Sequence, residues 1–478
     1  MNRRQFVHTA IAAAVTAPRA FPQTSPKLNF IVILMDDLGW ADLSCYGSKF
    51  YETPNLDRLA ATGIKFTNGY AACPVCSPSR ASIMTGKFAA RVGVTNYLPG
   101  KHQLPYSKLL PPESKPFLDL KETTVAEVLK GAGYTTAHVG KWHLGPTPEY
   151  WPEKQGFDVN IGGSNSGMPK SFFYPQWKGN PPVEGRDGEY LTDRLTDDAI
   201  GFIRTNKARP FFLYLAHYAV HVPIEAKEEM VKKYRAKLKP GQAQDDPVYA
   251  AMIESMDESV GRIVRTLEEL RLSENTVVIF TSDNGGLSAP EWKLKPVTSN
   301  APLREGKGHI YEGGIREPFI VKWPGVKPRI DDTPVCSIDI LPTLADAADA
   351  SRDTFSNIDG VSLTSLIRDR KPLPERPLFW HYPHYSNQLG RPAGAVRQED
   401  FKLVELYEGN RLELYNLTKD IGEKNNLADK MPDKTKQLHS MLKEWRASVG
   451  AQMPTANPNY DPKREDFGYW WRTGTQPK

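Results

Sequence analysis

Acidic side chains that could bind a metal ion occur at two distant places in the sequence. Asp36 and Asp37 follow the apolar run LNFIVILM, and Asp283 and Asn284 follow NTVVIFTS. Two adjacent buried carboxylates repel each other unless a cation lies between them. Because these residues offer only oxygen ligands, they favour a hard cation such as Ca²⁺ or Mg²⁺ over zinc, which prefers His and Cys. The segment DNGG taken alone could instead be a plain turn.

A second group of reactive residues lies in the segment ACPVCSPSR. It holds Cys73 and Cys76, two of the four cysteines in the chain, and ends on Arg80. The pair Ser77-Pro78 predicts a helix start, which puts Cys76 at a helix N-terminus, where an anion is favoured and a thiol ionises easily. A zinc site would need a second pair of soft ligands, and a redox dithiol would itself begin the helix. The residue types favour a reactive group at Cys76, without identifying it, and a small buried hydrophobe at Cys73.

Chargeable residues also follow two further apolar runs. Lys141 and His143 follow YTTAHVG, and His217 and His221 follow PFFLYLA. Short apolar runs that alternate with helical patterns predict a parallel sheet covered by helices. Such sheets bind ligands beyond the carboxyl ends of their strands. We therefore expect the polar residues that follow all four runs at one edge of one sheet.

The elements between these runs define the predicted architecture. Helices are expected in TPNLDRLAATG, in TTVAEVLKGAG and over 247–270, which has an apolar stripe at helical spacing. After about residue 375, short alternating strands and an amphipathic helix near 431–447 indicate a smaller unit. The sequence thus predicts an α/β fold with a large mixed, mostly parallel sheet sandwiched by helices at 26–375. An α+β subdomain, with an antiparallel sheet and a helix, is expected at 376–478.

The N-terminus MNRRQFVHTAIAAAVTAPRA has the three-part pattern of an export signal. Paired Arg3 and Arg4 precede a mild apolar stretch and then small residues, so we expect a bacterial twin-arginine-like signal over 1–25 and a periplasmic or extracellular protein. An ordinary N-terminal helix is the alternative. No apolar segment reaches the ~20 residues of a spanning helix, so no stable membrane insertion is expected. The net charge of +5 is scattered, which does not favour nucleic acid as a partner.

The run from Cys76 to Arg80, CSPSR, followed by MTG, resembles the signature of the formylglycine-dependent, arylsulfatase-like sulfatases of the alkaline phosphatase superfamily. In that family a maturation enzyme recognises this spacing and oxidises the cysteine to formylglycine. The segments MDDLGW, GKWHLG, HVP, SDNGG and GKGHIYEGGIREP resemble further family segments in the same order. The resemblance runs from about residue 29 to past residue 461. One departure is His309-Ile310, where small hydroxyl residues are commoner, and it affects no assigned role.

The resemblance implies a metal site and a catalytic group. The cation, Ca²⁺ rather than Mg²⁺, would be held by Asp36, Asp37, Asp283 and Asn284 together with oxygen atoms of the modified Cys76. The resemblance implies that one hydroxyl of the hydrated aldehyde attacks sulfur and that the other then expels sulfate, which is a form of covalent catalysis.

The resemblance also implies roles for cationic and histidine residues. The expected catalytic set is Cys76, Arg80, Lys141, His143, His221 and Lys307. Arg80 would stabilise the attacking hydroxyl, and His143 would deprotonate the second one. Lys141, His221 and Lys307 would neutralise sulfate oxygens, and His221 or Lys307 would protonate the leaving oxygen. His217 competes for the place of His221, but the family pattern HVP favours His221.

The implied function is hydrolysis of a sulfate ester on a carbohydrate derived from a polysaccharide. The segments QGFDVNIGGSNSG and NPNYDP resemble sulfatases assigned to galactose-type sugars, although such loops vary most. Two alternatives stay open at this point. A phosphomonoesterase or phosphonate esterase could use the same scaffold, although the oxygen-ligated metal and Lys307 favour sulfate. A non-catalytic binder of sulfated glycans is the second, and the filled catalytic positions disfavour it.

Overall fold

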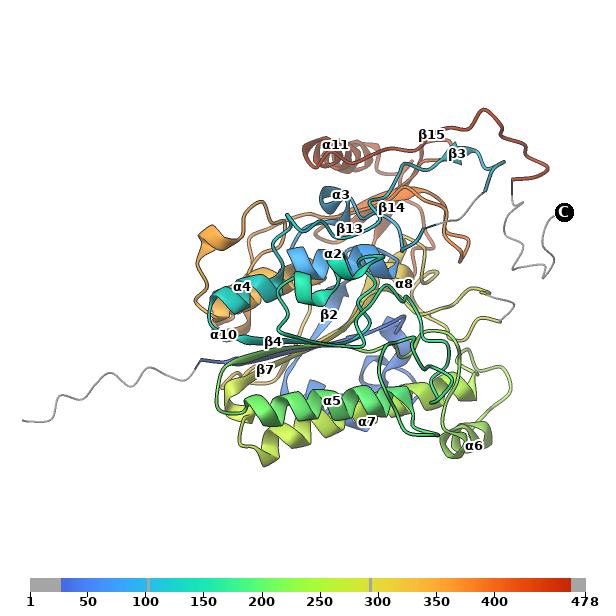
Figure 1. The fold of residues 1–478 in the computed structure, drawn as a ribbon. Helices are drawn as coiled ribbons and strands as arrows, with labels where there is room; N and C mark the ends of the chain where they lie inside the picture. The colour runs from blue at the N-terminus through green and yellow to red at the C-terminus, as the bar shows by residue number, and fades with distance from the viewer. Residues whose placement is uncertain (1–26, 101–103, 292–294, 466–478) are drawn as a thin grey trace, which may run out of the picture.

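The structure is a computed structural model, and it describes residues 27–100, 104–291 and 295–465. The predicted export signal at 1–25 lies outside the described residues. Figure 1 shows a layered molecule in which a large sheet, seen nearly edge-on, lies between two groups of helices. A second, smaller sheet and the helix α11 lie above the upper group.

The large sheet has nine strands in the order β10-β2-β8-β7-β1-β6-β4-β5, with β9 beside β2. Its four central strands run parallel to one another, and nearly every residue in them is buried. They are β7 (Thr276–Ser282), β1 (Asn29–Met35), β6 (Phe211–Ala216) and β4 (Thr135–Gly140). Strands that are covered on both faces have continuous apolar sequences, so these four strands could be predicted from the sequence.

The outer strands make the sheet mixed. One of them, β8, pairs antiparallel with both β2 and β7. The outer strands are β2 (Ile64–Tyr70), β5 (Val159–Ile161), β8 (Arg316–Lys322), β9 (Arg329–Asp331) and β10 (Val335–Cys336). The predicted α/β class with a large, mostly parallel sheet is confirmed.

Helices cover both faces of the sheet, each over its own hydrophobic core. The longest helix begins where the Asp246 side chain accepts hydrogen bonds from two backbone N–H groups and Pro247 takes the first helical position. One face carries α1 (Pro54–Thr62), α5 (Leu191–Asn206), α6 (Glu228–Ala236) and α7 (Pro247–Glu269). The other carries α2 (Cys76–Thr85), α4 (Val125–Gly131), α9 (Ile340–Ala347) and α10 (Thr364–Asp369).

The C-terminal part forms a four-stranded antiparallel sheet with one helix packed on it. Its elements are β11 (Leu378–Tyr382), β12 (Ala393–Gln398), β13 (Phe401–Leu406), β14 (Arg411–Asn416) and α11 (Pro432–Ser448). This matches the predicted α+β subdomain. One core joins this sheet to the segment before α2, and the indole of Trp380 donates a hydrogen bond to the carbonyl of Ala71 at 2.8 Å. The boundary at residue 375 stays a prediction.

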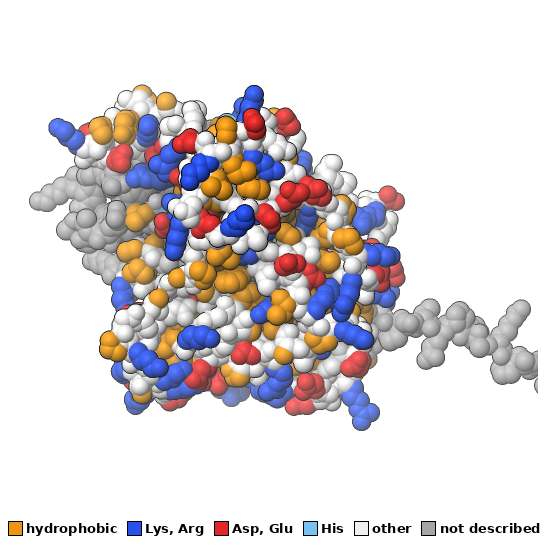
Figure 2. Space-filling model, turned by 180° about the vertical axis from the view of Figure 1, so that it is seen from behind, with side chains coloured by type: hydrophobic (Ala, Val, Ile, Leu, Met, Phe, Trp, Pro, Cys, Tyr) orange, Lys and Arg blue, Asp and Glu red, His pale blue; other side chains and the backbone are white. Residues whose placement is uncertain are grey.

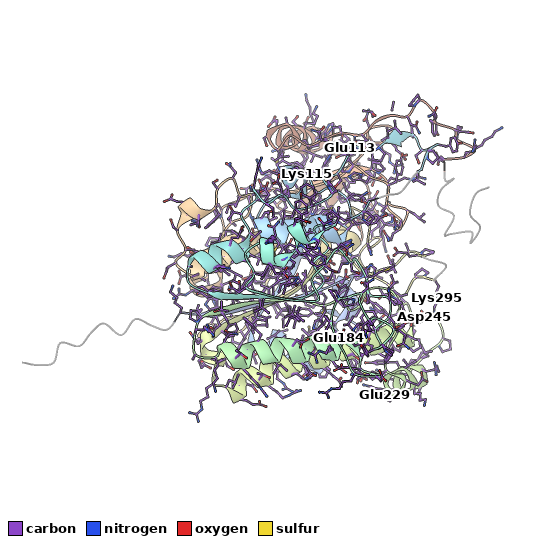
Figure 3. The ribbon with its side chains drawn as sticks, viewed as in Figure 1. Glu113, Lys115, Glu184, Glu229, Asp245 and Lys295 are labelled. Carbon is purple, nitrogen blue, oxygen red and sulfur yellow. The ribbon has the colours of Figure 1, made fainter. Side chains whose placement is uncertain are left out.

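Short elements complete the described chain: α3 (Ala89–Val92), α8 (Glu312–Ile315), β3 (Leu109–Leu110) and β15 (Thr455–Ala456). Within the described ranges, no helix combines the length and apolar character needed to cross a membrane. On the face shown in Figure 2, acidic and basic side chains are interspersed. Labelled charged residues such as Glu113, Glu229 and Lys295 lie at the periphery of the molecule (Figure 3).

Candidate active site

The carboxyl ends of the four central strands bring the predicted residues to one edge of the sheet. The register of β1 with β7 pairs Met35 with Ser282, so Asp36 and Asp283 leave the sheet side by side. At the end of β4, Gly140 has φ +106° and a Cβ there would lie 1.9 Å from the carbonyl oxygen of Ala216. Only glycine permits this close approach, from which the chain passes directly to Lys141.

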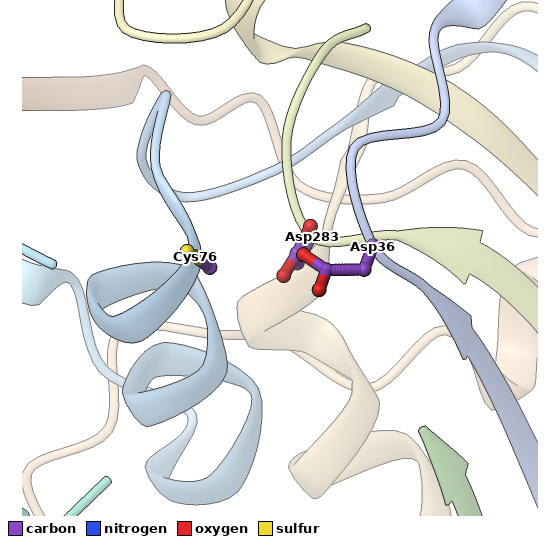
Figure 4. Close-up of side chains that lie close together, drawn as sticks. All are labelled: Asp36, Cys76 and Asp283. Atoms are coloured by element: carbon purple, nitrogen blue, oxygen red, sulfur yellow. The ribbon is translucent and has the colours of Figure 1, made fainter. Parts of the chain in front are cut away.

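The reactive cysteine lies at the first position of α2. Val75 precedes the helix in an extended conformation, and the Ser77 hydroxyl accepts a hydrogen bond from the backbone of Leu98 rather than capping the helix. The predicted start, with Ser77 as cap and Pro78 as the first helical residue, is therefore wrong by two residues: the helix already begins at Cys76, and Pro78 is tolerated within the first turn. Figure 4 shows Cys76 at the helix start, beside the side chains of Asp36 and Asp283 at the strand ends.

Ligand atoms converge in front of Cys76. One atom each from Asp36, Cys76 and Asp283 lies within 4.8 Å of the others. Among the described residues, no group donates a hydrogen bond to Oδ1 of Asp36 or to Oδ1 of Asn284, although both are buried. Buried polar atoms in native structures are nearly always paired, so these oxygens indicate a bound cation. The donor set fits a hard divalent ion.

Three buried cations surround the acidic cluster, and each is paired with one carboxylate. The contacts are Lys141 Nζ to Asp36 Oδ2 at 2.7 Å, Lys307 Nζ to Asp37 Oδ2 at 2.7 Å and Arg80 Nε to Asp283 Oδ2 at 2.8 Å. All six side chains are 5% exposed or less. Three positive charges balance three negative ones, so a divalent cation would leave an excess of two positive charges to receive an anionic ester.

The protonation of the cluster follows from its burial. Burial, only partly offset by Arg80, raises the pKa of Asp283 to about 6, and burial also raises the pKa of Asp36. Burial would likewise raise the pKa of Asp37, but Lys307 and His221 outweigh it and lower that pKa. The carboxyl groups therefore differ in how readily they give up protons, and a cation would compete with those protons.

The burial of Cys76 contradicts one expectation from the sequence. Desolvation raises the pKa of its thiol, despite Lys141 and Lys307, and the carboxylates of Asp36 and Asp283 add to the rise. The predicted easy ionisation at a helix N-terminus is wrong here, because desolvation outweighs both nearby ammonium groups. The unmodified side chain is a neutral thiol and a weak nucleophile.

The two expected catalytic histidines are held in defined tautomers. Nε2 of His143 donates to the carbonyl of Leu98, so Nδ1, which has no hydrogen-bond partner within the described part of the chain, carries the lone pair. Nδ1 of His221 donates to the carbonyl of Val222 at 2.9 Å, while its Nε2 accepts from Lys307 Nζ at 3.0 Å. Burial, followed by Lys307, lowers the pKa of His221 to about 4, and burial with Lys141 holds the pKa of His143 well below its usual value.

The rival histidine points elsewhere. Nε2 of His217 lies 2.9 Å from the hydroxyl of Ser259 on α7, inside the core of that face of the sheet. His221 instead lines the cavity that also contains Cys76, His143 and Lys307. The geometry thus brings the predicted catalytic set together without His217.

This cavity measures about 240 Å³ and opens in front of Cys76. Its wall includes residues that the sequence gave no reason to select, because they belong to loops without a motif: Tyr97, Leu98, Pro99, Met168, Glu291, Asn387 and Gln388. A larger cavity of about 680 Å³ near residues 46–50 contains none of the predicted site residues. The cavity thus lies beside three buried cationic side chains and an acidic cluster that could hold a metal ion, at the carboxyl edge of an α/β sheet.

Comparison with known proteins identifies the class of protein. The family model "Sulfatase" matches residues 28–350, and the model "N-sulphoglucosamine sulphohydrolase, C-terminal" matches 306–448. A sulfatase of Formosa agariphila is 33% identical, with 91% of each chain covered. The N-acetylgalactosamine-6-sulfatase of Canis lupus familiaris is 37% identical over 74% of this chain and 68% of its own. A crystal structure of Ps i-CgsB in complex with k-i-k-neocarrahexaose is 28% identical, with a TM-score of 0.73 and coverage of 95% and 98%.

The chain therefore belongs to the sulfatase family and is a sulfuric ester hydrolase. Members of this family generally use formylglycine and a divalent metal, and the buried acidic groups near Cys76 fit that chemistry.

Proposed function

We propose that this sulfatase removes sulfate from a sulfated carbohydrate, with formylglycine made from Cys76 as the nucleophile and Ca²⁺ as the cation. The observation that carries the proposal is the position of Cys76. It begins a helix, faces the cavity and has its sulfur within 4.8 Å of ligand oxygens of Asp36 and Asp283. A soft thiol is a poor ligand for a hard cation, whereas an oxygen-bearing side chain at the same place is a good one.

The cation would be held by Asp36, Asp37, Asp283 and Asn284, with an oxygen of the modified Cys76. Unpartnered oxygens on Asp36 and Asn284 support this set. When bound, the ion supplies positive charge that stabilises sulfate oxygens and the attacking group. Ca²⁺ is favoured over Mg²⁺ because carboxylates and an amide surround the site, whereas Mg²⁺ usually retains several waters.

The chain's own residues would prepare the attack and the release. Formylglycine, once made and hydrated, supplies one hydroxyl to attack sulfur and a second to expel sulfate. Arg80 lies one helical turn after Cys76, so both side chains lie on the same face of α2. Its guanidinium is fixed by Asp283 and by the carbonyl of Lys141 at 2.8 Å, and it would orient the attacking hydroxyl. The free Nδ1 of His143 would accept the proton of the second hydroxyl.

Departure of the alcohol would depend on Lys307 and His221. Although burial opposes it, Asp37 and Glu291 raise the pKa of Lys307 well above its usual value, so its amine stays protonated. His221 Nε2 accepts a hydrogen bond from that ammonium group, and the pair would deliver a proton to the leaving oxygen. Lys141, whose ammonium group lies 2.7 Å from Asp36 Oδ2, would neutralise sulfate oxygens.

A single sugar unit suits the size of the cavity. Its volume of about 240 Å³ lies below the ~300–1,000 Å³ typical of pockets for drug-sized ligands. Gly167 and Met168 line it; Gly167 ends the segment that resembles galactose-type sulfatases, and Met168 follows it directly. One relative is named for a sulfated galactosamine and one neighbouring structure contains k-i-k-neocarrahexaose, which agree with a saccharide substrate. We therefore place the sulfate on a galactose-type sugar.

The proposal includes a route out of the cytoplasm. The segment at 1–25, with Arg3 and Arg4, would direct export to the periplasm or beyond, where sulfated polysaccharide fragments are accessible. A formylglycine-generating enzyme would be a required partner before export.

The direct test is sulfate release by protein co-expressed with a formylglycine-generating enzyme. Mass spectrometry of the peptide that contains Cys76 first establishes the modification. We expect Ca²⁺-dependent release from galactose 6-sulfate and N-acetylgalactosamine 6-sulfate, and much slower hydrolysis of an aryl phosphate than of the matching aryl sulfate. Faster phosphate hydrolysis would identify a phosphoesterase. Binding without release by fully modified protein would identify a glycan-binding protein.

A further inference from the structure

A buried carboxylate in the cavity wall, apart from its effect on the pKa of Lys307, has no role in the chemistry described above. Glu291 lies in the loop between β7 and α8 and is 4% exposed. Among the described residues, no group donates a hydrogen bond to its Oε2. A buried acceptor that lacks a donor is costly, so a donor from outside the protein is expected when the site is in use.

The surroundings of Glu291 define which part of a substrate it meets. Its charge acts on Lys307 and His221, the two residues proposed to protonate the leaving oxygen, and on Tyr97, which lines the same cavity. A carboxylate repels sulfate, so it cannot bind the group that the three buried cations receive. Glu291 is also absent from the two clusters of potential metal ligands found among the described residues. It therefore faces the alcohol side of the ester.

Only a hydrogen-bond donor can satisfy Glu291, because an ionised carboxylate accepts and never donates. On a sugar the available donors are ring hydroxyl groups, and two neighbouring hydroxyls can bond to the two oxygens of one carboxylate. A second sulfate or a carboxylate at the same place would be repelled. Without Glu291, the excess positive charge of the site would attract sugars with several anionic groups as well as sugars with one sulfate.

We propose that Glu291 accepts hydrogen bonds from hydroxyl groups of the sugar ring that carries the scissile sulfate, and that it excludes rings with a second anionic group there. The inference deepens the proposed function and rests on it. The substrate class that follows is a monosulfated neutral sugar. Disulfated sugars and sulfated uronic acids are disfavoured.

The test compares parent and Glu291→Gln as full-length, modified, Ca²⁺-loaded enzymes. The substrates are galactose 6-sulfate, galactose 2,6-disulfate and 4-nitrophenyl sulfate, which has no hydroxyl groups. Loss of charge-assisted hydrogen bonds should lower the ratio of kcat/KM for galactose 6-sulfate over 4-nitrophenyl sulfate by roughly 10-fold. The ratio for the disulfated over the monosulfated sugar should rise. Glu291→Asp retains the charge and should recover part of the first ratio.

A matched control removes the same charge elsewhere. Glu229 is exposed on α6 at the periphery of the molecule (Figure 3), and Glu229→Gln should leave both ratios unchanged. Equal losses on all three substrates in Glu291→Gln would overturn the inference, because Glu291 would then act through Lys307. Unchanged ratios would also overturn it. A parent enzyme inactive on every sulfate ester would overturn the proposed function instead, and the inference with it.

Discussion

Lys402 links the C-terminal sheet to the segment that carries Lys307. Its ammonium group on β13 lies 2.9 Å from Oε1 of Glu312, the first residue of α8, and 2.9 Å from Oε1 of Glu423. All three side chains are fully buried. We expect Lys402→Met to destabilise the protein strongly, because it leaves two carboxylates in the interior without their shared cation.

The magnitude follows from the partners that remain. Removing one member of a buried ion pair costs about 3–5 kcal/mol. Glu312 keeps the hydroxyl of Tyr70 at 2.8 Å and Arg316 at 3.4 Å, so most of the loss comes from Glu423. We therefore expect about 3 kcal/mol, at the lower end of that range.

The loss should also depend on pH. Burial, partly offset by Lys402, raises the pKa of Glu423 from 4.5 to about 7. A raised pKa in the folded state means that protonation stabilises the fold fully below about 4.5 and that this contribution disappears as the pH rises through about 7. Glu423 is therefore largely neutral at pH 5.5 and needs Lys402 less. The penalty of Lys402→Met should be smaller at pH 5.5 than at pH 8.

Guanidinium unfolding followed by tryptophan fluorescence at the two pH values measures this. Lys371→Met is the control, since the Lys371 side chain is 70% exposed and its Nζ lies 3.7 Å from Oδ2 of Asp369. This substitution should lower the free energy of unfolding by less than about 0.5 kcal/mol. Adding Glu423→Gln to Lys402→Met should restore part of the stability at pH 8. A loss below about 1 kcal/mol at pH 8, or equal losses at both pH values, would refute the reasoning, since a broken buried pair costs more.

Three further outcomes are expected. Asp283→Ala should abolish turnover while the fold survives. A chelator should likewise abolish turnover of the parent enzyme, and Ca²⁺ should restore it better than zinc. Rescue by zinc alone would contradict the oxygen-ligand site. Cys76→Ser should attack sulfur once and retain the sulfate, because it lacks a second hydroxyl, giving a mass increase without turnover, whereas Cys73→Ser should retain activity. Replacing Arg3 and Arg4 by Lys should block export, and unchanged secretion would exclude the twin-arginine route.

The central sheet and the acidic cluster were predictable from the sequence because they depend on local patterns. A strand buried on both faces is apolar along its whole length, and the first polar residues after it mark its end, as Asp36 and Asp283 do. The resemblance to the family signature supplied what residue types alone could not, namely the proposed modification of Cys76. The predicted start of α2 was wrong by two residues because the Ser77 hydroxyl bonds to the backbone of Leu98, and such tertiary contacts override local capping preferences.

The substrate side of the cavity could not be predicted in the same way. Tyr97, Glu291 and Gln388 come from three loops that are far apart in the sequence, and none of them has a regular spacing to another. They meet only in the folded protein, where all three line one cavity. A buried acidic residue in a loop gives no local signal that separates it from an exposed one, so only the assembled structure identifies Glu291.

The burial of α2 constrains when Cys76 can be modified. Every residue of this helix is buried, and Cys76 itself is 3% exposed. An enzyme that must grip the residues from Cys76 to Arg80 cannot reach them in the folded protein, because Arg80 is bonded to Asp283 and to the carbonyl of Lys141. The proposed oxidation of Cys76 would therefore have to precede the packing of α2. A twin-arginine signal passes folded proteins, so export by that route would require the modification to be complete in the cytoplasm. Formylglycine should then be detectable at Cys76 in precursor that still carries its signal.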